Sequence, residues 1–265
     1  MPALTLRQLC PPDPLLLTLR DITRRIFQER NWPAPVFAEG AGPGQILWTL
    51  DPHLPPDGFR IESAPDDQIR IAGGSPRGIL YGMGRFLRQT RFTADAWQCS
   101  PWRGTSIPRL SMRGIYFATH FHNFYQDAPI EKVERYVEDL ALMGYNALNV
   151  WFDMHHYQGL ADPAAQCQLQ RLRDLLQTAR RVGMAAGIGV LANEGYRSTP
   201  RPLRATPTGR AHYGVEICPD QPGGVDLILA NLRGEFEAFC EVGLDFMWLW
   251  PYDQGGCACP ACAPW

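Results

Sequence analysis

Histidine, carboxylate and tyrosine side chains collect in four short stretches of this chain, and each stretch directly follows an apolar run. Two carboxyl groups near one substrate can act as general acid and base, or as acid and nucleophile. Histidine and tyrosine side chains can hydrogen-bond polar groups of a substrate. The candidate catalytic residues are Asp253 and Glu194, and the candidate substrate-binding residues are His120, His122, Asp153, His155, His156, Tyr196, Tyr252 and Gln254.

Each of the two candidate catalytic carboxylates has an alternative role. Asp253 lies two residues before a Gly-Gly pair at 255–256. It is either a catalytic or transition-state-stabilising carboxylate, or it only orders the glycine loop. Glu194 is either an acid or substrate ligand, or one partner of a salt bridge within its loop. Asp253 is the first choice for the catalytic carboxylate.

The histidines allow two kinds of site. His155-His156 follows Asp153, and His120 with His122 forms a second pair; either pair could hydrogen-bond hydroxyls or bind a metal ion. Neither pair has the helical i, i+4 spacing of a metalloprotease zinc site, which favours contact with sugar hydroxyls. Flat apolar faces for a sugar ring come from Trp151, Tyr157, Tyr196, Trp250 and Tyr252, of which those inside strands also fit core positions.

Three of the eight cysteines lie within six residues, at Cys257, Cys259 and Cys262. This spacing suits tetrahedral thiolate ligation of zinc, with Cys218 or a histidine as the fourth ligand. Free thiols and a disulfide are the alternatives. A closed shell of four ligands leaves no open position, so the predicted zinc is structural and catalysis is expected to need no cofactor.

The polar stretches are positioned by a regular alternation of strands and helices from residue 113 onward. Apolar runs predict the strands, and amphipathic runs closed by glycine predict the helices. The predicted strands are 113–118, 146–152, 184–191 and 245–250, and the predicted helices are 130–143, 169–182 and 224–242. Such alternation specifies parallel strands with helical crossovers. Because polar residues follow all four strands, a (β/α)₈ barrel fits better than a doubly wound sheet, whose site lies at one switch point.

The sequence before residue 106 has a different pattern, that of a small α+β domain. Two amphipathic helices are predicted, one capped by Asp13 and one beginning at Ser75. Short alternating runs predict strands, the last two of which form a hairpin. The helices are predicted at 13–30 and 75–89, and the strands at 45–50, 59–62 and 68–72.

The end of this first domain carries two further signals. Glycines at 78, 82 and 84 lack the G-x-G-x-x-G order of dinucleotide-binding proteins, which favours close packing of a helix instead. Residues 92–109 show no period and predict a linker. The domains are therefore assigned to residues 1–105 and 106–265.

Two segments resemble family 20 glycoside hydrolases and their hexosaminidase-like and α-glucuronidase-like relatives. The segment 59–82, with its FRI, IRIAGG and GILYG sequences, is similar to the hairpin and helix of the small domain that precedes the barrel in these enzymes. The segment 108–114, PRLSMRG, is similar to the beginning of their first barrel strand. The resemblance implies a small α+β domain followed by a (β/α)₈ catalytic barrel, and a glycosidase that hydrolyses O-glycosyl bonds.

The resemblance also bears on the catalytic residues, because the fourth barrel strand of the family ends in an Asp-Glu pair. In the family the Asp orients the acetamido group of the substrate, and the Glu protonates the leaving oxygen. Asp253 and Gln254 stand at these positions here, and an amide cannot donate a proton as a carboxylic acid does. The family's sugar-binding Arg is also missing, since Phe121 stands near its place. A carbohydrate-binding protein that keeps the barrel mouth without hydrolysis is therefore the alternative function.

Composition restricts the partners. A formal net charge of −2 over 265 residues provides no basic surface for nucleic acid, and no apolar run approaches the roughly 20 residues needed to cross a membrane. The expected partner is an oligosaccharide or glycoside. The first residues lack the basic and apolar regions of a secretory signal, which predicts a cytoplasmic protein. The sequence stops just after the fourth predicted strand, so a fragment holding the first half of the barrel is expected.

Overall fold

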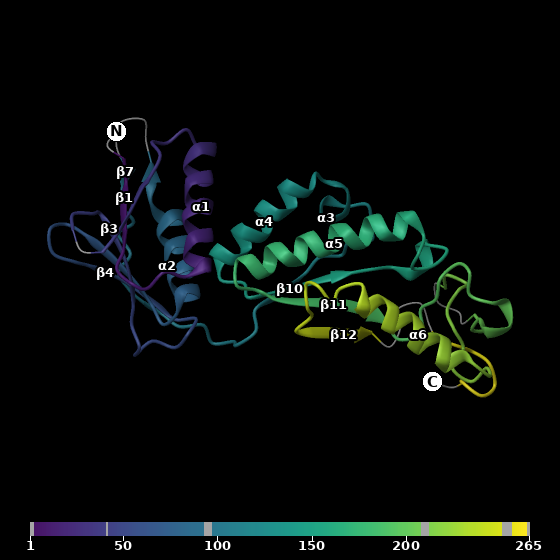
Figure 1. Ribbon diagram of the computed structural model, residues 1–265. Helices are drawn as coiled ribbons and strands as arrows, with labels where there is room; N and C mark the ends of the chain where they lie inside the picture. The colour runs from purple at the N-terminus through teal and green to yellow at the C-terminus, as the bar shows by residue number, and fades with distance from the viewer. Residues whose placement is uncertain (1–2, 41, 93–96, 208–211, 251–255, 264–265) are drawn as a thin grey trace. The chain divides into compact units, whose positions relative to one another are not determined.

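Figure 1 shows the computed structural model, which describes residues 3–40, 42–92, 97–207, 212–250 and 256–263. The chain divides into two units. The first unit consists of Met1–Arg113, Arg135–Asn146 and Thr178–Met184, and the second of Gly114–Glu134, Ala147–Gln177 and Ala185–Trp265. The predicted domain boundary after residue 105 falls inside a strand of the first unit, β8 (Gly104–Ser106).

A six-stranded mixed sheet forms the framework of the first unit. In sheet order the strands are β2 (Val36–Glu39), β1 (Thr5–Gln8), β3 (Ile46–Leu50), β5 (Ile69–Gly73), β4 (Phe59–Ser63) and β8. The pairs from β2 to β5 are parallel, whereas β4 pairs antiparallel with both β5 and β8. The predicted hairpin is the β4–β5 pair, in which the buried Ile61 lies opposite the buried Ile71. The alternation of apolar residues therefore decides which face of the hairpin is buried.

Two helices lie side by side on one face of this sheet, α1 (Pro14–Glu29) and α2 (Pro76–Gln89) (Figure 1). The Asp13 carboxylate accepts the backbone N–H of Leu15 at 2.8 Å, and the Ser75 hydroxyl accepts that of Arg77 at 3.2 Å. Both helices then begin with proline, whose fixed φ suits the first helical position. Both predicted helices and both predicted caps are confirmed.

The glycines of α2 lie where another stretch of backbone comes close. A Cβ atom at Gly84 would overlap the carbonyl oxygen of Leu142, and one at Gly78 would overlap that of Gly58. Close packing, rather than nucleotide binding, therefore explains these glycines.

The prediction of a linker over residues 92–109 is wrong. Within it, β8 pairs with β4 and extends the edge of the sheet. A second short pair joins β6 (Arg91–Phe92) to β7 (Trp97–Gln98). A strand of two or three residues is too short to show a period of two, so the sequence pattern could not reveal these strands.

The second unit contains a parallel sheet of four strands in the order β12-β11-β10-β9. Each pair is parallel, as the alternation of strands and helices predicts. The strands are β9 (Gly114–Tyr116), β10 (Ala147–Trp151), β11 (Ala185–Leu191) and β12 (Phe246–Trp250). Every residue of β10 is buried, which is typical of a parallel strand covered on both faces.

Successive strands are connected through α4 (Ile130–Met143), α5 (Pro163–Arg181) and α6 (Gly224–Glu237). Gly144 and Gly183 lie one and two residues beyond the ends of α4 and α5, with a φ of 104° and 77°, the left-handed backbone expected of a helix-terminating glycine. Gly243, with a φ of 72°, lies six residues beyond the end of α6. The predicted alternation is confirmed, with α5 beginning six residues earlier than predicted and α6 ending five residues earlier. No helix among the described residues is long and apolar enough to cross a membrane.

The outermost strand of this sheet, β12, keeps much of its apolar surface exposed. Met247 is 49% exposed and Leu249 is 54% exposed, although both lie in a strand whose other edge is paired to β11. The two tryptophans on the opposite face, Trp248 and Trp250, are also exposed. A contiguous apolar strand of this kind normally packs against further structure.

Candidate functional site

Four of the polar residues that follow β9, β10 and β11 lie together at the carboxyl ends of these parallel strands: His120, Asp153, His155 and Glu194. Thr119 fixes the segment after β9, because its hydroxyl donates to the carbonyl oxygen of Trp151 at 2.5 Å and accepts the backbone N–H of Trp151 at 3.0 Å. This arrangement brings His120 near Asp153, with 3.7 Å between Nδ1 and Oδ2. At that distance the two atoms are not hydrogen-bonded, and Nδ1 of His120 has no hydrogen-bond partner among the described residues.

Asp153 is the carboxyl group of this cluster that reaches a pocket. Its Oδ1 accepts a hydrogen bond of 2.6 Å from the indole N–H of Trp151. Burial, reinforced by the nearby Glu194, raises the pKa of Asp153 to about 7. The group can therefore give or take a proton near neutral pH, as a general acid or base must.

Glu194 lies deeper, with 3% of its surface exposed. Its Oε1 is 2.6 Å from Nδ1 of His155 and 3.1 Å from the backbone nitrogen of the same residue. Burial raises the pKa of Glu194 to about 8, and burial also lowers the pKa of His155. We therefore assign one shared proton to this pair, which leaves it without net charge.

The Asp153 and Glu194 carboxyl groups are neighbours. Nδ1 of His155 is 4.0 Å from Oδ1 of Asp153 as well as 2.6 Å from Oε1 of Glu194. The two oxygens thus lie at most roughly 7 Å apart, an upper limit that overlaps the roughly 5 to 9.5 Å separations of glycosidase carboxyl pairs. Glu194 is nevertheless buried beneath His155 and is not in the pocket lining, so the geometry fits a positioning role for it.

Two residues that the sequence did not single out complete the surroundings of His155. Tyr213 stacks on the imidazole with ring centroids 3.4 Å apart and an interplanar angle of 8°. The Glu216 carboxylate holds this segment in a turn, because it accepts the backbone N–H groups of Tyr213, Gly214 and Val215. Only the position of Glu216 between the apolar Val215 and Ile217 could have indicated that it is buried.

A third carboxyl group, Glu235 of α6, is completely buried. Neither of its oxygens has a hydrogen-bond partner among the described residues. Burial, with the charges of Glu194 and Asp153, raises its pKa well above the usual range, so it is protonated and neutral. The position of Glu235 in the sequence did not indicate burial, since a glutamate in an amphipathic helix is expected on the solvent face. The nearby Tyr196 is also buried, and its hydroxyl has no partner in the described part of the chain.

A pocket of about 140 Å³ opens at the carboxyl ends of the strands of the second unit. Its lining includes the titratable residues Asp153 and His120, and burial lowers the pKa of His120 to about 4, so this imidazole is neutral at pH 7. Aromatic rings supply most of the remaining surface. The lining residues are Tyr116, His120, Phe121, Trp151, Asp153, Leu191, Tyr213 and Trp250.

The other predicted substrate-binding residues have different surroundings. His156 packs edge to face against His155, with centroids 4.3 Å apart. The imidazoles of His155 and His156 and the carboxylate of Asp153 offer ligand atoms within 4.8 Å of one another, so a cation could be held there. His122 is not brought into the cluster: its exposed imidazole lies 3.6 Å from Asp127. Tyr252, Asp253 and Gln254 lie outside the described residues.

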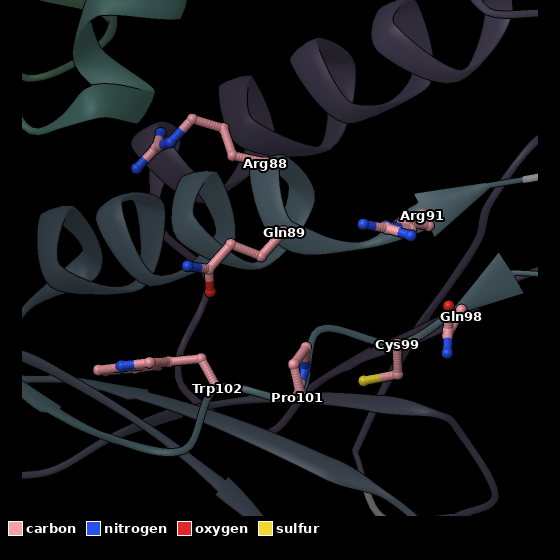
Figure 2. Close-up of a pocket in the computed structure, with 7 residues that line it drawn as sticks. All are labelled: Arg88, Gln89, Arg91, Gln98, Cys99, Pro101 and Trp102. Atoms are coloured by element: carbon pink, nitrogen blue, oxygen red, sulfur yellow. The ribbon is translucent and has the colours of Figure 1, made fainter.

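A larger pocket, of about 700 Å³, lies in the first unit. Figure 2 shows its seven lining side chains, which come from the end of α2, from the β6–β7 pair and from the segment up to Trp102. They include Arg88 and Arg91 but no carboxyl group, so they cannot supply the acid and base of hydrolysis. By contrast, the lining of the smaller pocket of the second unit includes the Asp153 carboxyl group.

The fold is similar to that of family 20 glycoside hydrolases of known structure. No family model and no curated protein sequence matches the chain. Among solved structures it is similar to the exo-β-N-acetylglucosaminidase of Vibrio harveyi, with a TM-score of 0.63 and 16% identity over 90% of this chain and 42% of that one. The Bacteroides fragilis β-N-acetylhexosaminidase has a TM-score of 0.59 and 14% identity over 91% of this chain and 51% of that one. The Flavobacterium johnsoniae chitobiase has a TM-score of 0.65 and 14% identity over 93% of this chain and 40% of that one.

These values define the chain as a protein with a family 20 glycoside hydrolase-like fold. The resemblance predicted from the sequence is thus confirmed at the level of the fold. The chain spans between 40% and 51% of the length of these three enzymes. What they bind or hydrolyse is a property of those proteins.

Proposed function

We propose that this chain forms part of a glycoside hydrolase whose sugar site lies at the carboxyl ends of β9 to β12. The observation that carries the proposal is the Asp153 carboxyl group, which lines a pocket with aromatic walls and has a pKa of about 7. Aromatic faces accept the apolar face of a sugar ring, and a carboxyl group accepts or donates hydrogen bonds to its hydroxyls.

The fold supports an N-acetylhexosaminide as the substrate. One structure with a similar fold, the Vibrio harveyi enzyme, is a complex with N-acetylglucosamine (TM-score 0.60, 16% identity). In the proposed site Asp153 exchanges protons or holds the substrate, while Glu194 positions His155. Asp253, four residues before Cys257, is proposed from the sequence as the second carboxylate.

We also propose that further β/α units complete the barrel and its site. Two observations support this. Among the described residues, the apolar side chains of β12 are exposed. The pocket of about 140 Å³ is also smaller than the roughly 300 Å³ at which small-molecule sites begin. For this reason the 265-residue chain alone is expected to hydrolyse aryl glycosides too slowly to detect.

Binding can test the hydrolase proposal without turnover. A hydrolase site is complementary to a flattened, positively charged sugar, whereas a carbohydrate-binding protein is complementary to the ground state. The affinities of the chain for N-acetylglucosamine and for its planar 1,5-lactone can be compared by tryptophan fluorescence. We expect the lactone to bind at least about tenfold more tightly. Equal affinities would instead support a carbohydrate-binding protein, and no binding of either compound would overturn the sugar site itself.

A further inference from the structure

The second unit brings four cysteine thiols together from two separate parts of the sequence. Cys218 lies between β11 and α6, and Cys257, Cys259 and Cys262 follow β12. The four sulfur atoms all lie within 4.8 Å of one another. The Sγ of Cys218 is 3.8 Å from that of Cys259 and 3.7 Å from that of Cys262.

These separations match a metal site rather than a disulfide. Zinc–thiolate bonds of about 2.3 Å in a tetrahedron place neighbouring sulfur atoms about 3.8 Å apart. Sulfur atoms joined in a disulfide lie about 2.05 Å apart, and all four cysteines are free here. The two separations from Cys218 thus match those around one tetrahedral ion, and all four sulfur atoms lie within 4.8 Å of one another.

The backbone around the sulfur atoms is arranged as in thiolate metal sites. The N–H of Thr206 donates to Sγ of Cys257 at 3.3 Å, and the N–H of Ala258 returns a bond of 3.0 Å to the carbonyl oxygen of Thr206. A turn from Cys259 to Cys262 is closed by the N–H of Cys262, which donates to the carbonyl oxygen of Cys259 at 3.0 Å. N–H···S hydrogen bonds of the first kind stabilise thiolate charge and orient the ligands.

Burial is the third observation. Cys218 is 1% exposed and Cys257 is 6% exposed, and both pack with Ala205 in a small apolar cluster against which Cys259 and Cys262 lie. Thiolates in such a place need a cation to neutralise them. The other four cysteines of the chain, at 10, 99, 167 and 240, lie outside this cluster.

We infer that Cys218, Cys257, Cys259 and Cys262 bind one structural Zn²⁺ ion. The ion links the segment before α6 to the segment after β12. Cys218 follows Glu216 by two residues, and Glu216 holds the turn that carries Tyr213. Through this connection the ion fixes one wall of the proposed sugar pocket, without a substrate position of its own, because four thiolates fill the tetrahedral shell.

Elemental analysis of the chain purified without chelator tests this inference. We expect about one zinc per chain, and a loss of most of it in Cys218→Ser and in Cys259→Ser. Cys167→Ser and Cys240→Ser are the matched controls, since both residues are exposed and lie outside the cluster. These variants are expected to keep the full zinc content.

A second measurement uses the wild-type protein and therefore does not depend on whether the variants fold. In the native wild-type protein no more than four of the eight cysteines should react with a thiol reagent, and all eight should react after chelation and denaturation. Replacement of zinc by Co²⁺ should give the strong visible bands of a tetrahedral thiolate site. Metal-free protein that stays metal-free after incubation with Zn²⁺, iron in place of zinc, or a disulfide among the four cysteines would each overturn the inference.

Discussion

The Nδ1 atom of His155 lies 2.6 Å from Oε1 of Glu194, and both side chains are buried. Because burial disfavours the charged form of each group, the two share one proton and form a neutral pair. His155 in turn stacks on Tyr213, which lines the pocket. The buried pair thus positions a residue that the proposed substrate would touch.

Removal of the Glu194 side chain should lower the free energy of unfolding. Glu194→Ala leaves Nδ1 of His155 without its hydrogen-bond partner and the backbone N–H of His155 without its acceptor, and we expect the free energy of unfolding to fall by roughly 2 to 5 kcal/mol. Glu194→Gln keeps an acceptor oxygen at the same place, so a loss below about 1.5 kcal/mol is expected. Urea denaturation of both variants measures the difference, and equal losses would show that the hydrogen bonds do not matter.

Glu235 makes stability depend on pH in a predictable direction. Its folded-state pKa is raised, so folding takes up a proton between the unfolded-state pKa, about 4.3, and the higher folded-state value. Its contribution to the free energy of unfolding therefore falls as pH rises through that interval. Glu235→Gln removes the proton uptake, so its stability relative to wild type should increase from pH 5 to pH 8 by up to about 1.4 kcal/mol per unit.

The control for this prediction is Glu237→Gln, which changes an exposed residue of the same helix. Urea midpoints for the wild type and both variants should be compared at several pH values. Only the difference between the wild type and Glu235→Gln should change with pH. A constant difference would mean that Glu235 is ionised, and therefore paired, in the folded protein.

Helices and strands could be predicted from the sequence where their periodic pattern of apolar residues is several residues long. The helices capped by Asp13 and Ser75, and the four parallel strands, follow from patterns that are several residues long. β8 could not be predicted because three residues carry no periodic pattern. The burial of Glu235 could not be predicted because local sequence does not show which face of a helix becomes buried. Tyr213 approaches His155 through a turn held by Glu216, a tertiary contact that no local spacing encodes.

Close packing at Gly84 offers a test of the first unit. A Cβ atom there would overlap the carbonyl oxygen of Leu142, which is backbone and cannot rotate away. Gly84→Ala should therefore lower the free energy of unfolding by about 1 to 3 kcal/mol. Gly159→Ala is the control, since no atom lies within 4 Å of its added Cβ, and a change within about 0.5 kcal/mol is expected. If both variants were equally stable, the predicted packing would be absent.

The pH dependence of sugar binding tests the central claim, that Asp153 is the titrating group of a sugar site. With a pKa of about 7, Asp153 becomes a carboxylate as pH rises from 6 to 8, and a carboxylate is the better acceptor for sugar hydroxyl and amide donors. Affinity for N-acetylglucosamine, measured by tryptophan fluorescence, should therefore increase over this range in the wild type. The same increase is expected in Asp21→Asn, a control on the exposed surface of the first unit. In Asp153→Asn binding should be weaker and independent of pH, whereas an affinity equal to that of the wild type at both ends of the range would contradict the account.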